Sequence, residues 1–226
     1  MPKLSYRLSV IASLVPKGAR VCDIGTDHGY LAIELIKTEK AKKVIATDIG
    51  EKPLSNARKN IELSKLSGIE LRLGNGLSCI KEEETDTVII AGMGGEVIAD
   101  ILKNGANIAT EKDTLILLQP TTSPEILRAF LYENGYNILN EIPIYENSKL
   151  YSVLSVKYTG EKKNFSGFDC FIGKVTPETE AGVLYIKKQQ KRCFECMTAL
   201  EHIERKQKEY LYYKQIFNEI SRFGEE

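Results

Sequence analysis

The chain has 226 residues, enough for one hydrophobic core or for a core with an appendage. Its 31 basic and 31 acidic residues leave no net charge, which argues against binding nucleic acid by bulk charge but allows a local basic patch. No apolar run approaches the roughly 18 residues of a membrane span, and the N-terminus does not have the pattern of a signal peptide. We therefore expect a cytoplasmic globular protein with no membrane partner.

Five cysteines are scattered along the chain, and only Cys193 and Cys196 form a C-x-x-C pair. A zinc site built on such a pair needs a second pair or nearby histidines, and the sequence offers neither. We therefore expect reduced thiols and no metal site.

The first element is an amphipathic helix over residues 3–15, which Pro16 and Gly18 bring to an end. Apolar runs then alternate with helical stretches. The expected strands are residues 19–24, 42–47, 69–74, 85–92 and 113–119, and the expected helices lie near 29–37, 53–66, 95–104 and 123–134. Strands separated by helical crossovers predict an α/β fold, in which helices cover both faces of a parallel sheet.

Two of these helices carry start signals. Pro53 suits the first turn of its helix, and Ser123 followed by Pro124 is typical of a capping residue and a proline at the first helical position. We therefore expect Ser123 to cap its helix.

The pattern changes after Gly135. Two strand-like runs flank the turn residues 146–148, which predicts an antiparallel hairpin closing the edge of the sheet. Polar residues 159–167 are typical of a linker. We therefore predict one domain over residues 1–158 and a second over residues 159–226.

The second domain is expected to be helical, because residues 178–223 contain no proline. Apolar side chains recur there every seven residues, a coiled-coil spacing, at Ile186, Cys193 and Leu200 and at Cys196, Ile203, Tyr210 and Phe217. A single helix would be about 60 Å long. We expect instead two helices folded back on each other, with the turn in residues 201–209.

The loop Asp23–Gly29 follows the first strand, and open parallel sheets bind ligands beyond the carboxyl ends of their strands. The loop does not match the dinucleotide pattern G-x-G-x-x-G, because Asp27 and Tyr30 stand where the second and third glycines belong. An acid at position 27 would repel a pyrophosphate. NAD is therefore disfavoured, and no G-K-[ST] follows a strand to make a P-loop.

S-adenosylmethionine suits this loop better, because it carries positive charges and no phosphate. Asp48 ends the second strand, where an acid can bind the ribose diol, and Asn75 after the third strand offers an acceptor for the adenine amine. The AGMGG segment after the fourth strand is a flat platform beside the transferable methyl group. The expected cofactor contacts are Asp23, Gly25, Thr26, Asp27, His28, Gly29, Asp48, Asn75, Gly76, Gly92 and Met93.

Simpler interpretations exist for single residues. Gly25 and Gly29 also suit close packing of a strand and a helix, and an acid such as Asp48 is often only solvated. A lone histidine such as His28 is more often hydrogen-bonded than catalytic. The order of four features after four successive strands favours the cofactor site.

The segments LSYRL, VPKGARVCDIGTDHGYL, LGNGL, DTVIIAGMGG and ILLQP resemble the bacterial tRNA (adenine-22-N1)-methyltransferase family. The resemblance covers residues 4–157, and IGTDHGYL and AGMGG are its most specific motifs. It implies a Rossmann-like class I methyltransferase fold with a C-terminal helical coiled-coil domain. It also implies S-adenosylmethionine as cofactor, tRNA as partner, and methylation of N1 of an adenine in the D-arm region.

Adenine N1 has an in-plane lone pair, so it attacks the methyl group without first losing a proton. The product is a cation, and negative charge near the ring assists its formation. We therefore expect Asp27 to stabilise that charge or to take a proton from the amine of the product cation, and His28 to orient Asp27 or hold the cofactor. Arg7 and Gln119 are expected on the substrate side. A basic cluster that suits either a solvated face or tRNA phosphates consists of Lys187, Lys188, Lys191 and Arg192.

Two other functions fit part of these observations. A methyltransferase for a small molecule would not need the helical tail. A non-catalytic module that binds RNA or protein would not bind S-adenosylmethionine. We expect the protein to be a monomer or a weak homodimer.

Overall fold

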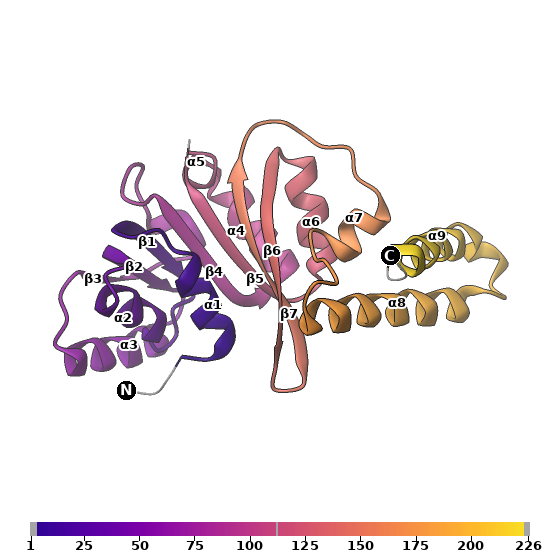
Figure 1. Cartoon of the computed structure of the whole chain (residues 1–226). Helices are drawn as coiled ribbons and strands as arrows, with labels where there is room; N and C mark the ends of the chain where they lie inside the picture. The colour runs from indigo at the N-terminus through magenta and orange to yellow at the C-terminus, as the bar shows by residue number, and fades with distance from the viewer. Residues whose placement is uncertain (1–3, 112, 224–226) are drawn as a thin grey trace.

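The computed structural model describes residues 4–111 and 113–223 and has a seven-stranded sheet at its centre, with helices on both faces (Figure 1). The strands are β1 (Ala19–Ile24), β2 (Ala41–Asp48), β3 (Ile69–Leu73), β4 (Thr87–Gly94), β5 (Leu115–Thr122), β6 (Tyr136–Glu146) and β7 (Lys149–Tyr158). Their order is β3-β2-β1-β4-β5-β7-β6. Strands β1 to β5 pair in parallel, whereas β7 is antiparallel to β5 and β6. The predicted parallel sheet with an antiparallel hairpin at its edge is confirmed.

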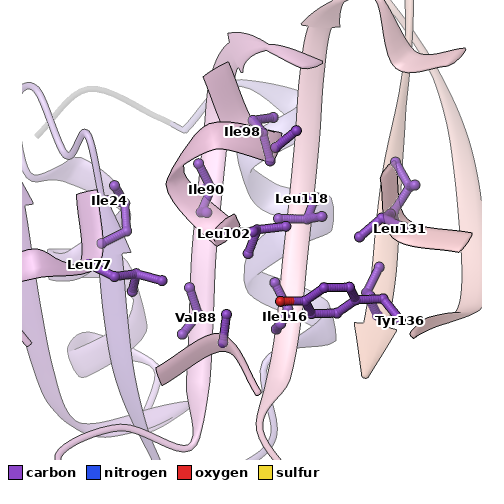
Figure 2. Close-up of a cluster of buried hydrophobic side chains, with 14 of the residues drawn as sticks. Ile24, Leu77, Val88, Ile90, Ile98, Leu102, Ile116, Leu118, Leu131 and Tyr136 are labelled. Carbon is purple, nitrogen blue, oxygen red and sulfur yellow. The ribbon is translucent and has the colours of Figure 1, made fainter. Parts of the chain in front are cut away.

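The helices that pack on the sheet are α1 (Tyr6–Leu14), α2 (Tyr30–Lys37), α3 (Glu51–Ser64), α4 (Gly95–Asn104), α5 (Ala106–Ala109) and α6 (Pro124–Glu133). Successive side chains of a strand point to opposite faces, so each face has its own hydrophobic cluster. On β4, Val88 and Ile90 join the cluster on the α4 face, and Ile89 joins the cluster on the α1 face. Figure 2 shows Ile98 and Leu102 of α4 over Val88 and Ile90. Burial on both faces explains why these strands are continuous apolar runs.

Details of the helix ends differ from the sequence analysis. Ser123 occupies the N-cap position of α6, as predicted, but it has a left-handed φ of 50° and its side chain makes no cap hydrogen bond. Pro124 is the first residue of α6, as predicted. Helix α3 begins at Glu51, so Pro53 lies inside its first turn.

The β6–β7 hairpin turns through Asn147 and Ser148, which have φ of 50° and 61°. Two positive φ values in a two-residue turn match the right-handed twist of the strands. Strand β7 pairs with β5 only through residues 154–156. Residues 142–153, which we call the hairpin tip, therefore project past β5 (Figure 1).

The tail consists of α7 (Gly167–Ile172), α8 (Glu180–Leu200), a short 3-10 turn (Glu204–Lys206) and α9 (Gln207–Phe223). Helices α8 and α9 pack side by side and antiparallel (Figure 1), which confirms the predicted folded-back pair. The predicted apolar repeat holds for Ile186 and Cys193, which are buried, but is wrong for Ile203, which is 37% exposed in the turn. Helix α9 instead buries Ile216 and Ile220. No helix in residues 4–111 and 113–223 has the length and apolar character needed to cross a membrane.

The tail is fixed to the sheet by Arg128 of α6, which is completely buried. Its guanidinium pairs with Glu141 of β6 and donates to the Tyr185 hydroxyl at 2.8 Å. It also donates to the carbonyls of Cys170 and Phe171 in α7. The tail's hydrophobic cluster includes side chains of the sheet domain, so the domain limits at residues 158 and 159 stay a prediction.

Candidate active site

The carboxyl end of β1 leads into a turn that is fixed to β2. The backbone N–H groups of Gly25 and Thr26 both donate to the carbonyl of Thr47, at 2.8 and 2.9 Å. Gly25 and Asp27 have φ of 75° and 52°, in the left-handed region where glycine and aspartate are favoured. The turn therefore needs these residue types, and it leaves the Asp27 side chain 67% exposed.

Asp48 at the end of β2 stabilises the turn from the other side. Its Oδ1 accepts from the Gly50 N–H at 2.9 Å, and its Oδ2 accepts from the Asp27 N–H at 3.4 Å. The carboxylate is thus held in place by two backbone groups. It faces the larger of two cavities that meet at the turn.

This larger cavity, the cofactor cleft, has a volume of about 360 Å³ and lies over the carboxyl ends of β1 to β4. It brings together five of the predicted cofactor residues, which are Gly25, Asp48, Asn75, Gly76 and Met93. Thr47 also lines the cleft, and its buried hydroxyl has no hydrogen-bond partner among the residues that the structure describes. The cleft therefore offers both a fixed carboxylate and an unused hydroxyl to a ligand.

Helix α4 supplies one wall of the cleft that the sequence analysis missed. Val97, Asp100, Ile101 and Asn104 line the cavity from this helix. Ile49, just after β2, and Leu77, in a 3-10 turn (Gly76–Cys79) that follows β3, line it as well. The signal was present in the sequence, because residues 97, 100, 101 and 104 have the spacing of one helical face directly after the AGMGG platform. The apolar side chains make a slot that suits a flat aromatic ring, with Asn75 and Asp100 as acceptors at its edge.

The smaller cavity, the target pocket, has a volume of about 240 Å³ and lies on the other side of Gly25. It is lined by Arg7, Leu8, Asp23, Gly25, Thr26, Asp27, His28, Tyr30, Leu31, Ala91 and Gly92. Gly25 lines both cavities, and a Cβ there would overlap the Met93 side chain. Gly92 has a φ of 81° and open space where its Cβ would be. The two cavities therefore meet at backbone without side chains.

Asp27 and His28 stand together at the target pocket. The His28 Nε2 lies 3.4 Å from the Asp27 Oδ2, and both side chains are largely exposed. The His28 ring stacks on Tyr30 with 5.4 Å between ring centroids. The Asn60 side chain donates to the His28 carbonyl at 2.9 Å, which holds the backbone of the pair. The arrangement presents a carboxylate beside an aromatic surface.

Asp23 is buried below the turn and accepts from the Thr26 hydroxyl at 2.7 Å. Burial raises the pKa of the Asp23 carboxyl to about 6, although the Thr26 hydrogen bond opposes this shift. The nearby Asp48 raises the pKa further. A bound cation would favour the ionised form of this acid.

Arg7 of α1 and Gln119 of β5 are joined by a hydrogen bond from Arg7 Nη1 to Gln119 Oε1 at 3.2 Å. The expectation that Gln119 faces the substrate is wrong, because its side chain is completely buried. Its Oε1 also accepts from the Gly92 N–H at 3.2 Å. Glu146 of the hairpin tip accepts from the Arg7 N–H at 3.3 Å, and its Oε2 lies 3.6 Å from Arg7 Nε. Gln119 therefore acts through Arg7 and Gly92.

Some predicted residues lie apart from both cavities. Gly29 lines neither of them, and a Cβ on it would lie 3.2 Å from the Cβ of Ala57 in α3. Its φ of 71° and this close contact support the packing interpretation. The predicted cofactor contact of Gly29 is thus not supported by its position.

The basic cluster lies on α8, outside both cavities. Lys187, Lys188 and Lys191 are exposed, whereas Arg192 pairs with Glu125 of α6 at 2.6 Å and lies over the Phe171 ring. Arg192 therefore helps to fix the tail. Within residues 4–111 and 113–223, no group of three or more His, Cys, Asp or Glu side chains is placed to hold a metal ion.

Residues 4–154 match the sequence profile of a family described as methyltransferase domain. The tRNA (adenine(22)-N(1))-methyltransferase of Bacillus subtilis is 36% identical over 190 residues, 82% of this chain and 79% of that protein. The crystal structure of the B. subtilis m1A22 tRNA methyltransferase TrmK superposes with a TM-score of 0.86 and 27% identity over 98% of each chain. That of M. capricolum TrmK with S-adenosylhomocysteine gives 0.80 and 28%, also over 98% of each chain.

These matches, with the sheet order and the glycine turn, define a Rossmann-like class I methyltransferase and confirm the predicted fold class. Within that class, the chain belongs to the tRNA (adenine(22)-N(1))-methyltransferase family.

Proposed function

We propose that the protein transfers a methyl group from S-adenosylmethionine to N1 of adenine 22 in tRNA. The sequence relative with this activity aligns with 82% of the chain. The observation that carries the proposal for this chain is the meeting of the cofactor cleft and the target pocket at Gly25. A methyl donor in one cavity and an acceptor ring in the other would be in contact only there.

The cofactor cleft has groups for each part of S-adenosylmethionine, which supplies an activated methyl group. The Asp48 carboxylate is held where it can accept from both ribose hydroxyls. The slot between Leu77 and Ile101 suits the adenine, with Asn75 as acceptor for its amine. Asp23 lies at the turn between the cavities, where its ionised carboxylate would stabilise the positive charges of the cofactor.

The target pocket suits a ring that becomes a cation. Adenine N1 lies on the Watson–Crick edge, so the base must leave its stack to enter the pocket. The Asp27 carboxylate stabilises the positive charge that develops when N1 takes the methyl group, and His28 orients Asp27. Gly92 leaves room for the ring, because no side chain fills that position.

The same proposal places tRNA on the exposed face of α8. Lys187, Lys188 and Lys191 would contact phosphates, which position the RNA without reading its sequence. Arg192 is left out of this set, because it is held at 2.6 Å by the mostly buried Glu125, whereas Lys191 and its partner Glu195 are both largely exposed. We infer a cytoplasmic protein that acts as a monomer or weak homodimer.

The experiment is to incubate the protein with S-adenosylmethionine and unmodified bacterial tRNA and to measure 1-methyladenosine by mass spectrometry. We expect the product with wild-type tRNA and none when adenine 22 is replaced. Asp27→Asn should lower kcat on the order of 100-fold with unchanged cofactor affinity, because it removes charge aimed at the reacting ring. Asp86→Asn, remote from both cavities, is the control. Cofactor binding without methyl transfer to tRNA would favour a small-molecule substrate instead.

A further inference from the structure

The hairpin tip carries one exposed aromatic side chain, Tyr145, which is 51% exposed. Its neighbour Ile144 is completely buried in the cluster under α1. Its cross-strand partner Leu150 packs against the tail cluster. The tip is thus fixed from both sides, by α1 on one face and by the tail on the other, while the Tyr145 ring stays in solvent.

The backbone that carries Tyr145 is held rigidly. Glu146, the next residue, binds both the backbone N–H and the guanidinium of Arg7. The turn that follows is a tight two-residue turn at Asn147 and Ser148. A ring presented by an ordered backbone loses little further entropy when a partner stacks on it.

The surroundings of Tyr145 are basic. Lys149 is exposed beside the turn, where it pairs with Glu146 and starts from the opposite face of the hairpin to Tyr145. The Lys188 ammonium lies 3.4 Å from the carbonyl of Leu150. Because Leu150 is the cross-strand partner of Tyr145, this lysine and the tyrosine border one surface. Partial burial, and to a smaller extent the charge of Arg192, lower the pKa of Lys188. Such a surface suits an anionic partner.

The position of this surface relative to the target pocket indicates which anionic partner would bind there. Arg7 lines the target pocket and is bound to Glu146, so the tip lies behind Arg7, next to that pocket. On the face that packs against the tail, Lys188 contacts the tip, and Lys187 and Lys191 are exposed near it on the same helix, α8. The Tyr145 surface therefore lies between the pocket for the reacting base and the lysine face of α8.

We propose that Tyr145 and Lys188, with Lys149 across the edge of the hairpin, bind an unpaired tRNA nucleotide that flanks the target adenine. When one base is turned out of its stack, a neighbouring base is left exposed, and aromatic side chains stack on such bases. The two ammonium groups bind the phosphates on either side of it. This inference rests on the proposed function and adds a contact that discriminates an unpaired region from a duplex.

The first test uses the absence of tryptophan from the sequence. Tyr145→Trp introduces a single indole, and stacking of a base on it should quench its fluorescence when an unmodified tRNA transcript binds. Tyr158→Trp, at the other end of the same hairpin and 36% exposed at the native tyrosine, is the matched control and should not be quenched. A fully paired RNA duplex of similar length should leave both unchanged.

The second test is kinetic. Tyr145→Ala should raise KM for tRNA about tenfold, since base stacking on an aromatic side chain is worth roughly 5- to 150-fold in affinity. Its kcat should change less than about twofold and its cofactor affinity not at all, because the contact is the same in the ground and transition states. Tyr145→Phe should restore wild-type KM. The double variant Lys149→Ala/Lys188→Ala should flatten the salt dependence of tRNA binding.

Several results would overturn the proposal. One is tRNA binding that leaves the Tyr145→Trp indole unquenched, and another is equal quenching by the duplex. A wild-type KM in Tyr145→Ala would assign the surface to another kind of partner, such as a protein. If the wild-type protein does not methylate tRNA but tRNA still quenches the indole, the proposed activity fails and this surface stands. If tRNA does not bind, both fail.

Discussion

Strand β6 carries two glutamates that pair with arginines in very different surroundings. Glu141 and Arg128 are both 0% exposed at their side chains, and Arg128 has three further acceptors in the tail. Glu146 and Arg7 are 13% and 29% exposed, and their partners are Gln119 and the backbone of α1. The first pair joins two parts of the fold, and the second borders the target pocket.

Because the two ion pairs differ in burial, they are expected to contribute differently to the stability of the protein. Removal of one partner from a buried pair leaves an uncompensated charge, which costs about 3–5 kcal/mol. A partly exposed pair contributes only about 0–1 kcal/mol to stability. The pair at the hairpin tip can therefore be changed without unfolding the protein, so its contribution to positioning can be measured.

The largest effect is expected at the buried pair. Arg128→Met should lower the free energy of unfolding by about 3–5 kcal/mol, because Glu141 then remains charged in the interior. Urea unfolding measures this change. The double variant Arg128→Met/Glu141→Met should recover part of the loss. A single variant as stable as the wild type would show that Arg128 does not fix the tail.

A smaller effect, and on activity rather than stability, is expected at the tip. Glu146→Ala should lower kcat for tRNA methylation roughly 30-fold, since Arg7 loses the charged acceptor of its backbone N–H and the ion pair to its guanidinium. Cofactor affinity and the unfolding midpoint should stay close to wild type. Glu146→Gln keeps an acceptor for the Arg7 N–H and should recover part of the rate.

Asp86 offers a matched control for Glu146. It accepts from the backbone N–H of Arg20 and pairs with the same arginine's side chain, but it lies away from both cavities. Asp86→Asn should leave kcat unchanged. An equal loss of rate in both variants would mean that Glu146 acts only on stability.

The smallest effect concerns Asp23, a buried acid with no ion pair among the residues that the structure describes. Its pKa of about 6 in the free protein should fall when the positively charged cofactor binds. Binding then releases a proton below pH 6, so the Kd for S-adenosylmethionine should be flat above that pH and rise about tenfold by pH 5. Titration calorimetry across this range measures it, and Asp23→Asn should remove the dependence. If the Kd of the wild-type protein does not change with pH, Asp23 does not interact with the charge of the bound cofactor.

The cofactor cleft was largely predictable, because its residues follow the ends of successive strands. Gly25, Asp48, Asn75 and Met93 each come directly after or at the end of an apolar run, and parallel strands bring these ends to one edge. The contribution of helix α4 to the cleft was not predicted, although its cleft residues have the spacing of one helical face. Gly29 was misassigned because a left-handed glycine needed for packing has the same sequence pattern as one that approaches a ligand.

The long-range contacts of Arg7 and Arg128 could not be predicted from the sequence. Arg7 and Glu146 are 139 positions apart, and Arg128 and Tyr185 are 57 apart. No periodicity links such positions, because each contact depends on how two elements pack. The buried Gln119 shows the same limit, since its place after an apolar run suggested exposure to the substrate while its side chain turns inward.

The buried guanidinium of Arg128 also has a consequence for the order of events during synthesis. Residues up to β7 leave the ribosome first, and they contain both Arg128 and Glu141. The remaining acceptors are the carbonyls of Cys170 and Phe171 and the Tyr185 hydroxyl, which emerge later. Domains fold as their residues appear during synthesis. The Arg128 guanidinium in the nascent sheet therefore lacks part of its hydrogen-bond acceptors until the start of α8 has been made. Final packing of the catalytic half therefore waits for the C-terminal part of its own chain.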